Sequence, residues 1–112
     1  MSDVLLTERR GRVLVMTLNR PDQRNALNAE LADALAASLT ELDQDAELTA
    51  GVLTGNGKNF CAGMDLKEFA TKGPPAALGP IFQNGCEKPL IGGVHGPVLA
   101  GGLELALVCD LL

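Results

Sequence analysis

The sequence predicts an α/β fold of parallel βα units, and three features of its pattern support this fold class. Short apolar segments with the composition of strands alternate with segments of helical periodicity along most of the chain. Stretches rich in glycine, proline and asparagine separate these segments. The chain has 112 residues, 46% of them hydrophobic, which is enough for one core. We therefore expect residues 1–112 to form one domain.

Two strands, one long helix and a third strand are predicted for the first half of the chain. Residues 4–6 and 13–18 are predicted to pair as an antiparallel hairpin. Asn28 is a good N-cap for the helix that follows. One face of this helix is apolar, with leucines every three or four residues at Leu31, Leu35, Leu39 and Leu42. Residues 51–54 then form a short buried strand.

The second half is predicted to begin with two short helices. Asp65 has the sequence context of an N-cap, and Glu68 follows three residues later at the capping-box position. The helix that they open is expected to end before Gly73. Residues 76–86 are predicted as a second helix, which the Gly79-Pro80 pair interrupts.

A glycine-rich loop between a predicted strand at 89–94 and a predicted apolar helix at 101–109 is the most informative stretch of the chain. Gly101 opens that helix, and Glu104 is the one carboxylate in its first turn. Glycine lets a backbone N–H approach a ligand closely, and a helix N-terminus carries unpaired donors and partial positive charge. Residues three apart share a helix face, so the pattern indicates an oxyanion site beside an acid/base group.

Composition and charge narrow the classes of partner. The net charge of −5 and the three Phe, without Trp or Tyr, argue against nucleic acid. No apolar run is long enough to span a membrane and no signal-peptide pattern is present, so we expect a cytoplasmic protein without a membrane partner. Five of the nine basic residues lie in the first 24 positions, which leaves room for a phosphorylated ligand there. The odd cysteines, Cys61, Cys86 and Cys109, lack zinc-site spacing, so we expect reduced thiols and no metal.

Three segments, taken in order and with their spacing, resemble the enoyl-CoA hydratase/isomerase (crotonase) family. They are residues 18–28 (LNRPDQRNALN), 59–66 (NFCAGMDL) and 94–106 (VHGPVLAGGLELA). The resemblance implies a crotonase-like (ClpP/crotonase) fold of ββα units, of which this chain is the N-terminal part. It also implies a lyase of fatty acid metabolism that adds water across the 2,3 double bond of an enoyl-CoA thioester. Coenzyme A arrives with the substrate, so no cofactor is implied, and the complete chain is expected to form a homotrimer or hexamer.

The resemblance also implies roles for individual residues. The N–H groups of Met64 and Gly101 match the two family donors that hold the thioester carbonyl oxygen, and Glu104 matches the glutamate of the hydratases. The segment from Arg24 to Leu27 is similar to the loop that lines the CoA channel. The residues expected to bind substrate are Arg24, Ala26, Leu27, Ala62, Asp65 and Leu66. The side chain of Met64 stands where a smaller residue is frequent, so we expect it to shape acyl selectivity.

Several alternatives stay open at this point. A double-bond isomerase would use the same oxyanion site with one carboxylate. The chain could also be a non-catalytic fragment that binds CoA weakly or serves in assembly. Family hydratases use a second glutamate that lies beyond Leu112, so we expect the isolated 112-residue chain to have negligible hydratase activity and to self-associate or need the remaining half.

Each motif has a structural interpretation beside the functional one. Asp65 can be only a helix cap, Met64 only a partner of Phe69 in a hydrophobic staple, and Glu104 a buried carboxylate paired with an arginine. The Gly101-Gly102 pair can be an ordinary tight turn into a helix. Cys61 with His95 as its base would be a thiol nucleophile, although nothing in the sequence places the two together. His95 alone is more typical of a structural loop residue.

Overall fold

A four-stranded sheet is the framework of the computed structural model, which describes residues 3–96 and 101–111. Its strands, in the order in which they neighbour one another, are β1 (Leu5–Arg10), β2 (Val13–Leu18), β3 (Ala50–Gly55) and β4 (Leu90–Gly93). β1 and β2 pair antiparallel, as the predicted hairpin requires, and β3 and β4 continue the sheet in parallel. The predicted α/β class is therefore confirmed.

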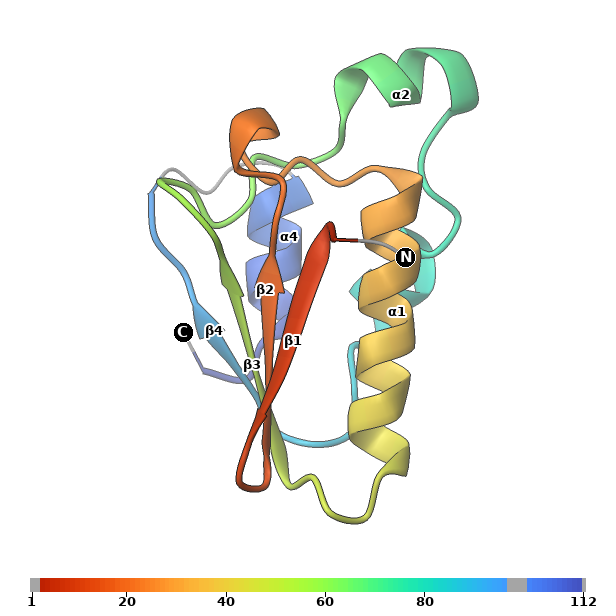
Figure 1. Ribbon diagram of the computed structural model, residues 1–112. Helices are drawn as coiled ribbons and strands as arrows, with labels where there is room; N and C mark the ends of the chain where they lie inside the picture. Colours follow the sequence, from red (N-terminus) through yellow and green to blue (C-terminus); the bar gives the residue numbers. More distant parts are fainter. Residues whose placement is uncertain (1–2, 97–100, 112) are drawn as a thin grey trace.

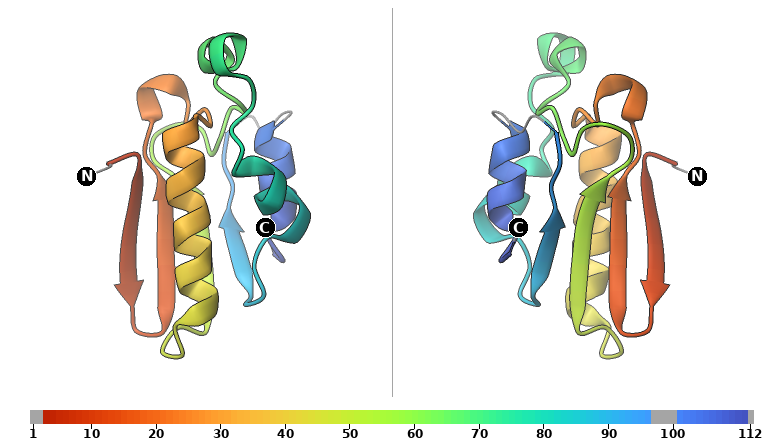
Figure 2. Two further views of the ribbon diagram at one scale, coloured as in Figure 1. Left: turned by 90° about the vertical axis from the view of Figure 1, so that its right-hand side faces the viewer. Right: turned by 90° about the vertical axis from the view of Figure 1, so that its left-hand side faces the viewer.

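The helices gather on one face of this sheet. They are α1 (Ala29–Gln44), α2 (Leu66–Lys72), α3 (Leu78–Asn84) and α4 (Gly101–Val108), with a short 3-10 turn, η1, at Pro21–Gln23. Figure 1 shows α1 and α4 on the same side of the strands, with α2 standing beyond the end of the sheet. The two views of Figure 2 look at the helical side and at the side on which the strands face the viewer.

The core lies between the sheet and α1. Alternate residues of β2, namely Leu14, Met16 and Leu18, are buried, as a strand with one packed face requires. The predicted leucine stripe of α1 is buried in full at Leu31, Leu35, Leu39 and Leu42. The predicted N-cap is also confirmed, because the Oδ1 of Asn28 accepts a hydrogen bond of 2.9 Å from the N–H of Leu31.

Two predicted boundaries were wrong. α3 is continuous from Leu78 to Asn84, because Pro80 lies in its first turn, where no N–H is needed for a helical hydrogen bond. β1 extends through polar residues to Arg10, because every one of its residues pairs with β2. At the end of this strand, Arg9 forms ion pairs of 2.7 Å with both Glu41 and Asp45, which join the hairpin to α1.

The carboxyl ends of β2, β3 and β4 meet at one edge of the sheet, which is the upper edge in Figure 1. In open parallel sheets this edge is where ligands bind. The loops that follow β2 and β3 lie there, as do η1 and the N-terminus of α1. The parts of the sequence that were singled out for function therefore converge on one edge of the sheet.

Candidate functional site

Two loops at this edge are joined into a short parallel pairing, which we call the strap. It consists of residues 24–27 after η1 and residues 62–65 before α2. Three backbone hydrogen bonds hold it, from the N–H of Ala62 to Arg24 O (3.0 Å), of Leu27 to Gly63 O (2.7 Å) and of Asp65 to Leu27 O (2.9 Å). The strap thus brings two of the three family-like segments into direct contact.

Met64 lies opposite Leu27 in the strap. The N–H and C=O of Leu27 bond to the residues on either side of Met64, so Met64 turns its own N–H and C=O away from Leu27. Among the residues that the structure describes, no acceptor contacts the N–H of Met64. Within residues 3–96 and 101–111, this N–H is therefore a donor without an acceptor, of the kind that an oxyanion site requires.

The start of α4 packs directly on the strap. α4 begins at Gly101, so this residue does not lie in the middle of the helix. A Cβ built on Gly102 would collide with the carbonyl oxygen of Cys61 and lie 3.4 Å from the nitrogen of Gly63. Only glycine permits this approach. The first turn of α4 therefore packs against the backbone of Gly63, the residue before Met64.

Two pockets meet at Met64. The first, of about 430 Å³, is apolar except for one carboxylate and is lined by Met64, Pro74, Pro75, Ala76, Leu78, Gly79, Phe82 and Glu104. The second, of about 400 Å³, is polar and is lined by Gln23, Arg24, Ala26, Ala62, Met64, Asp65, Leu66 and Lys67. We call them the apolar pocket and the polar pocket.

The sequence-predicted site residues divide between these pockets. Arg24, Ala26, Ala62, Asp65 and Leu66 line the polar pocket, Glu104 lines the apolar pocket, and Met64 lines both. Leu27 lines neither, because its side chain is wholly buried in the core and its backbone is used in the strap. Leu27 therefore holds the loop in place, whereas the five predicted residues that line the polar pocket are the ones that a ligand can reach.

Glu104 is exposed, so the alternative of a buried structural carboxylate does not hold. Its apolar sequence neighbours Leu103 and Leu107 are exposed on the same face of α4, whereas Leu105 and Ala106 are buried on the other face. The apolar residues of α4 therefore do not bury this carboxylate in the part of the chain that the structure describes. No arginine pairs with Glu104 in the described part of the chain, so the alternative of a buried ion pair is wrong.

Most of the arginines near the N-terminus are engaged in the fold. Arg9 and Arg10 form ion pairs, Arg12 donates to the carbonyl of Ala46, and Arg20 bonds to Asp65. Arg24 is exposed in the polar pocket, and its guanidinium contacts no acceptor among the residues described. Of the five arginines in the first 24 positions, Arg24 is therefore the one whose guanidinium is available to an anionic ligand in the described structure.

Asp65 caps α2 and also joins it to the preceding loop. Its Oδ1 accepts from the N–H groups of Lys67 (3.1 Å) and Glu68 (3.2 Å), and its Oδ2 lies 3.0 Å from the guanidinium of Arg20. The N–H of Glu68 and then the guanidinium of Arg20 hold the pKa of Asp65 below its ordinary value. The predicted N-cap is confirmed, and Asp65 also faces the polar pocket.

The predicted capping box was wrong in its second half. The carboxylate of Glu68 does not return to the N–H of Asp65, which donates to Leu27 O in the strap. Its Oε2 instead accepts a hydrogen bond of 2.7 Å from the N–H of Ala29, the first residue of α1. A capping-box pattern is local, so it gives no signal for a bond between two different helices.

Asn25 is a functional candidate to which the sequence assigned no role. It is fully buried, and its side-chain amide bonds to the backbone of two other loop segments. Asn25 and Arg24 both have left-handed backbone conformations, with φ values of 57° and 53°. Two consecutive non-glycine residues in this region are uncommon and point to a loop whose shape is imposed by its surroundings.

The thiol alternative is not supported by the site. Cys61 is buried, and its burial raises the pKa of its thiol to about 11. The ring nitrogens of His95 lie 3.3 Å from Gly93 O and 3.0 Å from Gly57 O, and neither contacts Cys61 in the described structure. A thiol that keeps its proton and lies away from a base is inert as a nucleophile, so both residues are structural here.

Raising the pH from 9 towards 11 is expected to destabilise the fold through Cys61. In this window the unfolded chain releases the thiol proton, whereas the folded chain retains it because its pKa is about 11. The folded state then binds more protons, so the free energy of unfolding falls as the pH rises, by about 2 kcal/mol for this thiol. Urea unfolding of the wild type and of Cys61→Ala across this range measures the effect. Equal pH slopes for the two proteins would contradict it.

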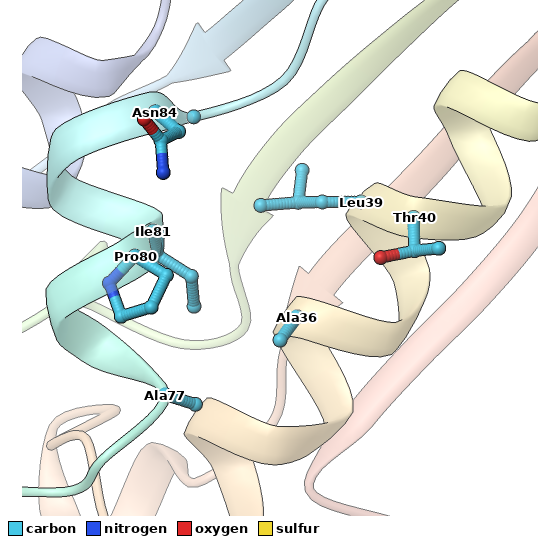
Figure 3. Close-up of a pocket in the computed structure, with 8 residues that line it drawn as sticks. Ala36, Leu39, Thr40, Ala77, Pro80, Ile81 and Asn84 are labelled. Carbon is cyan, nitrogen blue, oxygen red and sulfur yellow. The ribbon is translucent and has the colours of Figure 1, made fainter.

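A third pocket, of about 280 Å³, lies between α1 and α3. Figure 3 shows Leu39 and Ala36 of α1 facing Ile81 and Pro80 of α3 across it. The described residues that line it include no titratable side chain, so it offers no acid/base chemistry. Residues 3–96 and 101–111 contain no group of three His, Cys, Asp or Glu side chains placed to hold a metal ion. Of the helices described, none combines the length and apolarity needed to cross a bilayer.

Comparison with known proteins assigns the family. The model of the enoyl-CoA hydratase/isomerase family matches residues 8–112. The chain is 40% identical to enoyl-CoA hydratase EchA19 of Mycobacterium tuberculosis and 41% identical to 2,3-dehydroadipyl-CoA hydratase of Escherichia coli. These alignments cover 95% and 96% of this chain but 44% and 45% of the relatives, so the chain spans less than half of their length.

A solved structure agrees with this assignment. The fold matches the crystal structure of a probable enoyl-CoA hydratase/isomerase from Mycobacterium abscessus with a TM-score of 0.91 and 45% identity. The match covers 100% of this chain and 46% of that protein. The strap, the glycine at the start of α4 and the three family-like segments lie within the matched region. The chain belongs to the enoyl-CoA hydratase/isomerase family and has a crotonase-like α/β fold.

Proposed function

We propose that the protein binds enoyl-CoA thioesters and adds water across their 2,3 double bond. The observation that carries the proposal is the position of Met64, which lines both the polar and the apolar pocket. A CoA thioester is polyanionic at one end and apolar at the other, with its reactive carbonyl between them. A free N–H at the junction of the two pockets is where that carbonyl would need a donor.

The polar pocket suits the anionic part of CoA. It presents the free guanidinium of Arg24 and the ammonium of Lys67. Its carboxylate, Asp65, is already neutralised by Arg20. A pocket with two available cations in a chain of net charge −5 is a local reversal of sign, and it favours a phosphorylated ligand. Ala26 and Ala62 leave space for the ligand between these charges.

The apolar pocket suits the acyl group and holds the candidate acid/base residue. Hydration forms a bond from a water oxygen to carbon 3, and the electron pair of the double bond moves through carbon 2 to the thioester oxygen. The N–H groups of Met64 and Gly101 would stabilise the resulting enolate oxygen. Glu104 would accept a proton from the water and return it to carbon 2 of the enolate, which leaves the carboxylate ionised as it began. The carboxylate lines the same pocket as Met64, as this sequence of steps requires.

The remaining expectations belong to the same proposal. The protein acts in the cytoplasm as a homo-oligomer, a trimer or hexamer, and takes part in fatty acid metabolism. It needs no metal or redox cofactor, because the chemistry consists of proton transfer and charge stabilisation alone. Its partner is the acyl-CoA substrate, with neither nucleic acid nor membrane involved.

The test measures binding and turnover separately. Calorimetry with CoA is expected to show binding that weakens about tenfold in Arg24→Gln, the scale of one hydrogen bond to a charged group. Arg10→Gln is the matched control, because Arg10 is exposed and pairs only with Glu8. Hydration of crotonyl-CoA by a complete protein that carries this chain is followed as the loss of the absorbance of the conjugated thioester.

The outcomes separate the possibilities. Binding that is weakened by Arg24→Gln but not by Arg10→Gln, together with formation of the 3-hydroxyacyl thioester, supports the proposal. A shifted double bond without uptake of water would identify an isomerase instead. Absence of both CoA binding and turnover would refute the proposal.

A further inference from the structure

We propose that Asn25 is the positioning residue that sets the N–H of Met64 for catalysis. This inference rests on the proposed role of that N–H as a donor to the thioester oxygen. Asn25 does not line either pocket that meets at Met64, so it does not act on the substrate directly. It acts through the backbone of the loops that carry the strap.

The side chain of Asn25 is a three-way connection. Its Oδ1 accepts a hydrogen bond of 2.7 Å from the N–H of Arg20. Its Nδ2 donates to the carbonyl oxygens of Asn56 (3.0 Å) and Asn59 (2.8 Å). Asn25 itself is fully buried, so its amide would be left without partners if these bonds were broken. One planar group therefore holds the loop after β2 against the loop after β3.

The backbone turn at Arg24 and Asn25 links this side chain to the strap. The left-handed conformations of Arg24 and Asn25 follow η1. The N–H of Asn25 donates to Arg20 O (2.8 Å), and that of Arg24 donates to Pro21 O (3.1 Å). The chain then leaves this turn with the carbonyl of Arg24 placed for the N–H of Ala62. The conformation that Asn25 stabilises thus provides the first hydrogen bond of the strap.

The second loop carries the connection to Met64. Asn56 and Asn59, which accept from Asn25, lie in the segment that runs from β3 to Phe60 and then into the strap. The packing there is close, because a Cβ built on Gly55 would lie 2.8 Å from both the Nδ2 of Asn25 and the oxygen of Asn59. Asn25 therefore fixes the relative position of both strands of the strap, which determines where the N–H of Met64 points.

The experiment uses a complete protein that carries this chain and compares variants that separate the amide from the backbone conformation. Asn25→Asp keeps the shape and tolerates the left-handed conformation, but it removes both N–H donors. Asn25→Gly keeps the backbone freedom and removes the whole side chain. Both variants are expected to lower kcat for crotonyl-CoA hydration by about a hundredfold, the scale of a misplaced catalytic group, with CoA affinity within twofold of wild type. Asn84→Asp, an exposed exchange of the same chemistry at the end of α3, is the matched control.

A spectroscopic readout distinguishes positioning from mere structural support. A chromophoric enoyl-CoA thioester absorbs at longer wavelength when donors polarise its carbonyl, and this shift is expected to shrink in Asn25→Asp and Asn25→Gly. Hydrogen exchange of the folded proteins is expected to accelerate at the N–H groups of Ala62 and Asp65 and not in α1. This second measurement applies to any folded fraction, so poor yield of one variant does not remove the test.

The results separate this proposal from the proposed function. Wild-type protein with neither the spectral shift nor hydration would overturn both. A wild type that shows both, with Asn25→Asp and Asn25→Gly retaining its kcat and its shift, would overturn the positioning role alone. Lower melting temperatures with kcat and shift unchanged would assign Asn25 to stability and likewise overturn it.

Discussion

Replacing Gly102 by alanine is expected to lower the free energy of unfolding by about 2 kcal/mol or more and to reduce turnover by about a hundredfold. The added Cβ would collide with the carbonyl oxygen of Cys61, which belongs to the backbone and cannot rotate away. α4 would then have to move off the strap, which separates Gly101 and Glu104 from Met64. Denaturant unfolding and crotonyl-CoA hydration, both with a complete protein that carries this chain, measure the two effects.

Gly79→Ala is the matched control for this substitution. Gly79 lies in α3, and a Cβ built there meets no atom within 4 Å. The exchange is expected to alter stability by less than about 1 kcal/mol, in the favourable direction. It controls the stability effect alone, because Gly79 also lines the apolar pocket. Wild-type stability and turnover in Gly102→Ala would contradict the close approach of α4 to the strap.

In a complete protein that carries this sequence, replacing Glu104 by glutamine is expected to reduce kcat for hydration by about a hundredfold or more, the scale of a general acid/base group. Glutamine keeps the size of the side chain in the apolar pocket but cannot accept a proton from water. The affinity for CoA should change little, because the cations that would bind it lie in the other pocket. Steady-state kinetics and calorimetry together test this split between kcat and binding.

Glu30→Gln is the control for the loss of a negative charge. Glu30 is an exposed glutamate in the first turn of α1, so it has the same relation to its helix as Glu104 has to α4. Any general effect of charge or helix dipole would appear in both variants. Turnover in Glu104→Gln equal to that of Glu30→Gln would reject Glu104 as the acid/base residue.

Local features of the sequence were sufficient for the helix starts and for the core. Asn28 and Asp65 cap α1 and α2 as predicted, because a cap depends on hydrogen bonds within three residues. The leucine stripe of α1 was buried as its spacing predicted, because one helix face must cover the sheet. The beginning of α4 at Gly101 also followed from the glycine pair.

Interactions between distant residues were not predictable in the same way. The bond from Ala29 to Glu68 and the ion pair between Arg20 and Asp65 join residues about 40 positions apart, and no periodicity signals them. The burial of Asn25 was missed because asparagine in a loop is ordinarily an exposed turn residue. The surroundings of Glu104 stayed open because apolar composition does not show which face of a helix is covered.

Pairing between Leu27 and Met64 closes a segment of chain that contains all of α1 and β3. The entropy of closing such a loop is recovered only once α1 and β3 bring its two ends together. We therefore expect the N–H of Met64 to reach its place late in folding, after the helix and the parallel strand have assembled. A ligand that binds at this N–H stabilises only the chain in which the strap has formed, and not the separate helix and strand. Ligand binding is therefore expected to measure how much of the protein has completed this pairing.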